Sequence, residues 1–173
     1  MVGRVSDTQL QIQWLTKAIE HQPNFVDAYV ELGNQYFDCK DYQRACTYYQ
    51  YAIEFQPHYV DAWVNLGVIH TELKEYQRAL DELNYAERLS TNIAYLYFNR
   101  GNVHRELKQY TEALQDFHRA IELNPNFATA YTNRGNIYTM FKMPQQASQD
   151  YAQAIRLEPQ DLYLSSLVIG SPQ

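Results

Sequence analysis

An Asn-Arg-Gly-Asn block occurs twice in this chain, at residues 99–102 and 133–136. Glycine beside polar side chains could cradle a phosphate, and asparagine with arginine could stabilise charge in a catalytic site. The motifs that usually perform such chemistry, G-x-x-x-x-G-K-S/T, G-x-G-x-x-G, G-x-S-x-G and H-E-x-x-H, are absent. We therefore expect no catalytic residues, no enzymatic activity and no cofactor.

Histidine and cysteine are the other residue types that could do chemistry. Histidines occur at positions 21, 58, 70, 104 and 118, and only His70 and His104 are related by a regular spacing. No carboxylate or cysteine recurs in register with these two, so we predict that they are packing residues and that no metal site exists. Cys39 and Cys46 are the only cysteines, which favours free thiols over a disulfide framework.

Composition and charge exclude several classes of protein. The formal net charge of −6 leaves no basic excess for a protein that tracks nucleic-acid phosphates. No segment approaches the roughly 18 consecutive apolar residues of a membrane-spanning helix, and the first residues lack the apolar run of a signal peptide. We expect no nucleic-acid partner, no membrane association and a cytoplasmic location.

The glycines of both blocks belong to a longer series. Gly33, Gly67, Gly101 and Gly135 are each 34 residues apart, and two sets of alanines keep the same spacing. An aromatic residue precedes each of these glycines by four positions, and prolines close three of the four periods. A fixed period of this length indicates a repeat architecture.

Each period reads as two helices joined by a short turn. Tyr29, Leu32, Gly33 and Tyr36 share one helical face, since residues spaced by three, four and seven lie on the same side of a helix. A second helix follows and ends at the proline. Because one pair cannot bury its apolar face alone, neighbouring pairs must stack.

Arginine stands at a packing position of the first helix in the last two periods. Arg100 and Arg134 occupy the place that leucine holds in the first two periods, and an aspartate follows sixteen residues later, as Asp116 and Asp150. We predict that Arg100–Asp116 and Arg134–Asp150 form ion pairs that link the two helices of their period.

The segments "AYVELGNQYF", "LYFNRGNVHR" and "AYTNRGNIYT", with their alanine-rich second halves, resemble tetratricopeptide (TPR) repeats. The resemblance implies an all-α fold, a right-handed α-solenoid of helix-turn-helix repeats whose first helices line a concave groove. We place repeats 1 to 4 at residues 26–59, 60–93, 94–127 and 128–161. An N-terminal half repeat or capping helix is expected at 1–25, and a tail or partial helix at 162–173.

The first helices carry a second stripe opposite their packing face, and we predict that it binds a peptide. Asparagine amides offer both a donor and an acceptor to an extended backbone, and three of these asparagines are in register, as in some TPR superhelices. Asparagine is also common in ordinary TPR helices, where it orders the helices. The candidate peptide-binding residues are Asn34, Asn65, Asn99, Asn102, Asn133, Asn136, Val64, Val68, Tyr95 and Phe98.

The charge on this stripe indicates the kind of partner. Repeats 1 and 2 contribute acidic residues and no base, whereas Tyr95 and Phe98 offer an apolar anchor in repeat 3. We expect a protein or peptide partner that is basic or apolar. TPR domains that grip the acidic C-terminal tail of chaperones use lysine and arginine here. Because Val30, Tyr95 and Asn99 stand at those places, like charge disfavours that ligand.

The function predicted from the sequence is a protein–protein interaction scaffold that binds an extended or helical peptide segment. Two alternatives remain open. The chain could be a structural module that self-associates through its repeat ends, where Trp14 and residues 167–169 are apolar. It could also be an accessory domain of a longer multidomain protein.

Overall fold

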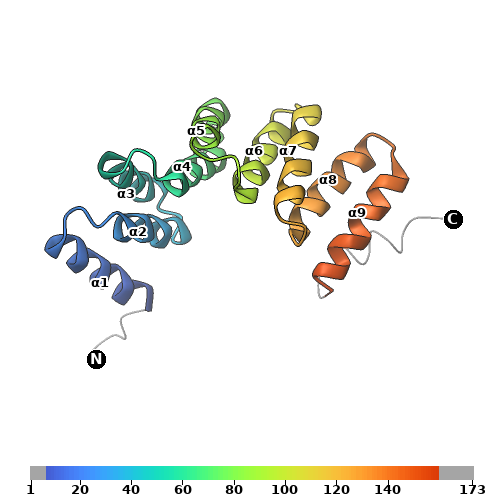
Figure 1. Ribbon diagram of the computed structural model, residues 1–173. Helices are drawn as coiled ribbons and strands as arrows, with labels where there is room; N and C mark the ends of the chain where they lie inside the picture. Colours follow the sequence, from blue (N-terminus) through green and yellow to red (C-terminus); the bar gives the residue numbers. More distant parts are fainter. Residues whose placement is uncertain (1–6, 160–173) are drawn as a thin grey trace. The chain divides into compact units, whose positions relative to one another are not determined.

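The computed structural model describes residues 7–159, and this part of the chain is all α-helical (Figure 1). The first helices are α1 (Asp7–His21), α2 (Val26–Asp38), α3 (Tyr42–Phe55), α4 (Val60–Glu72) and α5 (Tyr76–Leu89). The remaining helices are α6 (Ala94–Glu106), α7 (Tyr110–Leu123), α8 (Ala128–Met140) and α9 (Pro144–Leu157). The expected tail at 162–173 lies outside the described residues.

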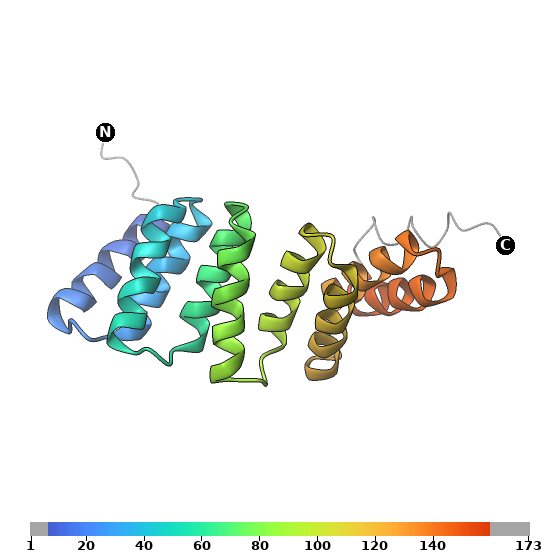
Figure 2. The same cartoon turned by 90° about the horizontal axis from the view of Figure 1, so that it is seen from above.

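The helices fall into two compact units, which are described separately. Unit 1 holds α1 to α5 and unit 2 holds α6 to α9. In unit 1, α2 pairs with α3 and α4 with α5, while α1 packs on α2 and α3 on α4. Unit 2 repeats the arrangement, with α6 paired to α7, α8 paired to α9, and α7 packed on α8 (Figure 2). The all-α class and the pairing predicted from the period are confirmed.

Every turn within a helix pair has the same backbone geometry. Lys40 has φ of 60°, its N–H donates to the carbonyl of Phe37 at 2.8 Å, and the next N–H reaches the carbonyl of Tyr36 at 2.9 Å. This is the left-handed helix ending that glycine usually provides. The same conformation recurs at Lys74, Lys108 and Lys142, so each lysine bears a small backbone strain that glycine would not.

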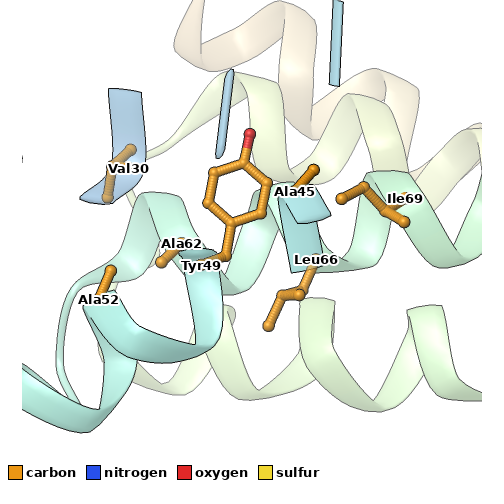
Figure 3. Close-up of a cluster of buried hydrophobic side chains, with 7 residues drawn as sticks. All are labelled: Val30, Ala45, Tyr49, Ala52, Ala62, Leu66 and Ile69. Atoms are coloured by element: carbon orange, nitrogen blue, oxygen red, sulfur yellow. The ribbon is translucent and has the colours of Figure 1, made fainter. Parts of the chain in front are cut away.

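The core of unit 1 is built from small and large residues in alternation. Tyr49 is 2% exposed and lies among alanines of α3 and α4 (Figure 3). The alanines let the backbones approach closely, and the larger side chains fill the remaining space. The buried cluster consists of Val30, Ala45, Tyr49, Ala52, Ala62, Leu66 and Ile69.

Helix α1 differs from the helices that follow it, because none of its residues is buried. Trp14 is 70% exposed and Leu10 is 41% exposed. Its Ala18 and the following Pro23 are in register with Ala52 and Pro57 of repeat 1. This register is the one expected of the second helix of a repeat. Among the described residues, no helix is long and apolar enough to cross a membrane.

Candidate peptide-binding site

In unit 1, Asn34 is a junction between three helices. Its Oδ1 accepts a hydrogen bond from the Tyr49 hydroxyl of α3 at 2.8 Å and another from Nδ2 of Asn65 in α4 at 3.3 Å. Its own Nδ2 donates to Glu31 at 3.0 Å. Because both lone pairs of Oδ1 are engaged, this atom has no further capacity to accept from a ligand. Asn34 therefore orders the helices.

Unit 2 contains the same kind of contact. Nδ2 of Asn133 in α8 donates to Oδ1 of Asn102 in α6 at 2.8 Å. Oδ1 of Asn136 accepts from the Tyr151 hydroxyl of α9 at 2.8 Å. Nδ2 of Asn99 donates to the carbonyl of Tyr95 one turn earlier, at 2.8 Å.

These contacts divide the six predicted asparagines into two groups. Asn34, Asn102 and Asn136 use Oδ1 to accept bonds from other helices. The other three, in register at every 34th position, donate through Nδ2, and within residues 7–159 their Oδ1 atoms accept nothing. We name these three the register asparagines: Asn65, Asn99 and Asn133.

The ordering role has a sequence signal that we did not use. Tyr49 and Tyr151 follow Asn34 and Asn136 by fifteen residues, and each tyrosine hydroxyl donates to its asparagine. In repeat 2 the residue at the tyrosine position is Leu83, which has no hydroxyl, and Val68 replaces the asparagine. In repeats 1 and 4 this asparagine therefore serves the second helix, whereas in repeat 3 Phe117 has no hydroxyl and Asn102 accepts from Asn133 instead.

Two of the predicted apolar contacts differ in their exposure. Val64 is 1% exposed, so its side chain is not available to a ligand. Phe98 is half-buried, with its ring 4.7 Å from that of Phe127 and 6.0 Å from that of Phe117. Both occupy the register of Val30, which belongs to the core of unit 1. The stripe therefore includes a packing position, whereas Tyr95 is 45% exposed.

The acidic character of the α2 and α4 stripe is present at the surface of unit 1. The side chains of Asp27, Glu31, Asp38, Asp61 and Glu72 are exposed. Asp27 accepts a hydrogen bond from the Tyr59 hydroxyl at 2.8 Å. Burial of the phenol, with this hydrogen bond, raises the pKa of Tyr59 to about 12. In unit 2, Arg105 pairs with the neighbouring Glu106 at 3.0 Å.

The two ion pairs predicted from the sequence are confirmed. Arg100 contacts both carboxylate oxygens of Asp116, at 2.9 and 2.8 Å, and Arg134 contacts both of Asp150, at 2.8 and 2.7 Å. Both aspartates are buried. The arginines of the repeated block therefore link the two helices of each pair in unit 2.

Comparison with known proteins identifies the family. Tetratricopeptide-repeat family models match residues 14–47, 94–127 and 128–161, and a further TPR model matches residues 33–74. The chain belongs to the tetratricopeptide-repeat family. No curated protein matches the sequence. Domains of TPR repeats are generally scaffolds for protein–protein interaction, and no catalytic family matches the chain.

Solved structures of TPR proteins have the same fold. The thermophilic TPR protein TTC0263 of Thermus thermophilus superposes with a TM-score of 0.78 at 20% identity, over 91% of this chain and 87% of that one. MamA of Desulfovibrio magneticus RS-1 gives 0.75 at 20% identity, over 90% and 89%. The APC/C hetero-tetramer Cut9–Hcn1 gives 0.86 at 21% identity, over 96% of this chain and 34% of the other. Identities this low establish the fold only.

A histidine–glutamate pair is buried in the second TPR repeat. Nδ1 of His70 in α4 lies 2.6 Å from Oε2 of Glu82 in α5, and the residues are 2% and 8% exposed. Nε2 of His70 lies 3.9 Å from Glu75, and Arg78 lies near both glutamates. His70 is thus a packing residue with a polar partner, which the sequence analysis missed. Within residues 7–159 no group of three or more His, Cys, Asp or Glu could hold a metal.

This pair predicts how the stability of the TPR unit depends on pH. Burial raises the pKa of the Glu82 carboxyl above its ordinary value, although the bond to His70 acts in the opposite direction. The folded state therefore favours the protonated Glu82 carboxyl, which adds to the free energy of unfolding. This added stability is fully present below the ordinary pKa of about 4.3 and is lost as the pH rises through the raised pKa. We expect the difference in unfolding free energy between the wild type and Glu82→Gln to fall over this range. Urea unfolding at several pH values measures this difference. A difference that grows with pH would contradict a raised pKa of Glu82 in the folded state.

Proposed function

We propose that this TPR protein is a scaffold that binds an extended peptide segment along the exposed stripe of its first helices. Each unit presents its own part of this stripe, α2 and α4 in unit 1 and α6 and α8 in unit 2. The supporting observation is the division of the asparagines. Among the described residues 7–159, the carbonyl oxygen and the second amide proton of each register asparagine have no partner, and these asparagines recur at a constant spacing in the sequence. An amide with both groups available can pair with one peptide group of a backbone, largely irrespective of its sequence.

The partner segment is basic or apolar. Exposed carboxylates on α2 and α4, without an exposed base on the same stripe, favour lysine or arginine in the segment bound to unit 1. The exposed ring of Tyr95 offers an apolar contact in unit 2. An acidic chaperone tail would meet like charge on unit 1, and the lysine and arginine positions that such tails require are occupied by other residue types.

Substitution of the register asparagines tests the proposal. A peptide selected on the wild-type chain from a random displayed library supplies the ligand. Asn65→Ala, Asn99→Ala and Asn133→Ala together should weaken its affinity at least about tenfold, since each lost hydrogen bond contributes about 0.5–1.5 kcal/mol. Isothermal titration calorimetry measures the affinity, with helical content followed by circular dichroism.

A matched control distinguishes the effect of removing asparagines of the stripe from the effect of removing asparagines elsewhere on the surface. Asn24, Asn92 and Asn126 are exposed loop residues of the same type, and their triple alanine variant should bind as the wild type does. Equal affinity of the register triple variant and the wild type would reject the role of the asparagines. Binding that does not weaken with added salt would reject the electrostatic part.

A structural module that self-associates is the alternative with support in the described residues. Trp14 of α1 is 70% exposed, and α1 has no buried residue. The apolar residues 167–169, which the sequence analysis assigned to the other end, lie outside the described part. A molecular mass in solution that increases with concentration favours this alternative.

A further inference from the structure

Two exposed aromatic rings of α3 lie next to a half-buried aromatic ring of α2. Tyr51 and Phe55 are 44% and 46% exposed, and Tyr29 of α2 lies between them, with ring centroids 5.7 Å from Tyr51 and 5.4 Å from Phe55. We name Tyr29, Tyr51 and Phe55 the α3 aromatic patch. The exposed rings are carried by a second helix of the TPR pair, so this surface is separate from the stripe of first helices proposed above.

The residues equivalent to Tyr29 in repeats 3 and 4 each have an arginine of the chain itself near the ring. Arg134 lies 5.6 Å from the ring of Tyr131 in repeat 4. Arg100 and Arg119 lie 5.4 and 5.8 Å from the ring of Tyr97 in repeat 3. These distances are within the range in which a guanidinium is attracted to the face of an aromatic ring.

Repeat 2 has the arrangement most like the α3 aromatic patch. Trp63 packs on Tyr85 with ring centroids 4.4 Å apart, as Tyr29 packs on Tyr51, and the guanidinium of Arg88 lies 5.1 Å from the Tyr85 ring. Tyr85 and Tyr51 are separated by one period, and so are Arg88 and residue 54. The residue at position 54 is glutamate, so repeat 1 has a carboxylate at the place of the arginine.

At the α3 aromatic patch, the residue in the register of Arg88 is therefore an acid instead of a base. Within residues 7–159 no lysine or arginine lies over Tyr29, Tyr51 or Phe55. Glu54 is exposed and forms no ion pair with the described residues. One turn of helix separates Glu54 from Tyr51, so the carboxylate and the ring border the same surface.

We infer that the α3 aromatic patch binds an arginine side chain of a protein partner. The guanidinium lies on the Tyr51 ring, as that of Arg88 lies on Tyr85, and Glu54 supplies the opposite charge. Arginine fits this surface better than an apolar side chain because the planar guanidinium both stacks on a ring and hydrogen-bonds to a carboxylate. Within the chain, Tyr85 holds the same position in repeat 2 and has Arg88 near its ring.

A short peptide probe tests the inference by nuclear magnetic resonance. Acetyl-Gly-Arg-Gly-Arg-Gly-amide should shift the ring resonances of Tyr51 and Phe55, and its citrulline counterpart, which has the shape of arginine without the charge, should not. Tyr51→Ala should weaken the affinity by about 2- to 30-fold, the range expected for one cation–aromatic contact. Glu54→Arg should reduce binding at least as much, because the new arginine would cover the Tyr51 ring from within the chain. Glu54→Arg retains every ring, so its effect is separate from any loss of packing.

Two controls distinguish this surface from the proposed peptide stripe. Glu112→Arg introduces the same charge change on an exposed position of α7 and should leave binding of the probe unchanged. Asp61→Asn alters the acidic stripe and should leave the Tyr51 and Phe55 shifts in place. The inference is overturned if the probe does not bind, or if Asp61→Asn removes the shifts while Glu54→Arg does not. Loss of the shifts in Asp61→Asn but not in Glu54→Arg would overturn this inference without contradicting the proposed function. The inference is also overturned if the Tyr51 and Phe55 resonances shift when the protein alone is concentrated, because a second copy of the chain would then occupy the α3 aromatic patch.

Discussion

Replacing Asp150 with alanine is expected to lower the free energy of unfolding by about 3–5 kcal/mol, the usual effect of removing one partner of a buried ion pair. Arg134 is 13% exposed at its side chain and contacts both oxygens of Asp150. Without the aspartate its charge would remain largely shielded from water, with the ring nitrogen of His118 at 3.2 Å as a remaining neighbour. The effect should be much larger than that of an exposed pair such as Arg119–Glu122.

Repeat 1 supplies the matched variant for this experiment. Leu32, Tyr36 and Tyr48 occupy the positions that Arg134, Tyr138 and Asp150 hold in repeat 4. The double substitution Arg134→Leu with Asp150→Tyr therefore gives repeat 4 a set of side chains that already packs elsewhere in the chain. Its stability should lie within about 1.5 kcal/mol of the wild type, because replacing a whole buried pair by fitting apolar groups is often neutral.

Urea unfolding followed by circular dichroism measures both variants. If the single variant and the double variant lose the same stability, the loss reflects packing at position 150 rather than an unpaired charge. If Asp150→Ala is as stable as the wild type, the pair does not hold α8 and α9 together.

Replacing Gly33 with alanine is the second substitution expected to destabilise the fold. The added Cβ would lie 2.7 Å from Cδ1 and 2.8 Å from Cζ of the Tyr49 ring, which is 2% exposed. Displacing the ring would also disturb the hydrogen bond from its hydroxyl to Asn34. Overpacking of this kind costs about 1–3 kcal/mol. The higher helix propensity of alanine offsets about 1 kcal/mol of this loss.

The net loss for Gly33→Ala should therefore be up to about 2 kcal/mol, measured as a lower urea midpoint. A Gln50→Ala variant at an exposed position of α3 shows the effect of alanine without a close neighbour, and it should not destabilise the chain. A Gly33→Ala variant more stable than the wild type would mean that the helices separate easily at this crossing.

The 34-residue period was sufficient to predict the helix pairs, because glycine, alanine and aromatic residues at fixed positions specify where backbones cross. It also predicted Arg100–Asp116 and Arg134–Asp150, since two charges that change together at one spacing have few explanations other than contact. The period could not distinguish the residues of the outward stripe that are accessible from those that pack into the core. Val64 and Phe98 lie on the same helical face as the asparagines, yet that register packs into the core.

The histidine–glutamate pair was missed for a related reason. His70 was compared with residues of its own register in other repeats, where no carboxylate recurs. Its partner Glu82 is twelve residues away in the same repeat, at the position that Tyr48 holds in repeat 1. A pair that forms within one repeat does not recur with the 34-residue period when the other repeats have different side chains at the two positions.

The junction at Asn34 has a consequence for how unit 1 opens. One oxygen atom accepts from α3 of its own repeat and from α4 of the next, so fraying of either repeat removes a bond from the other. In a linear array, such shared bonds act as the coupling between neighbours that makes them unfold together. Amide protons of α2, α3 and α4 should accordingly exchange with solvent at similar free energies, and Asn34→Ala should let the two repeats exchange independently.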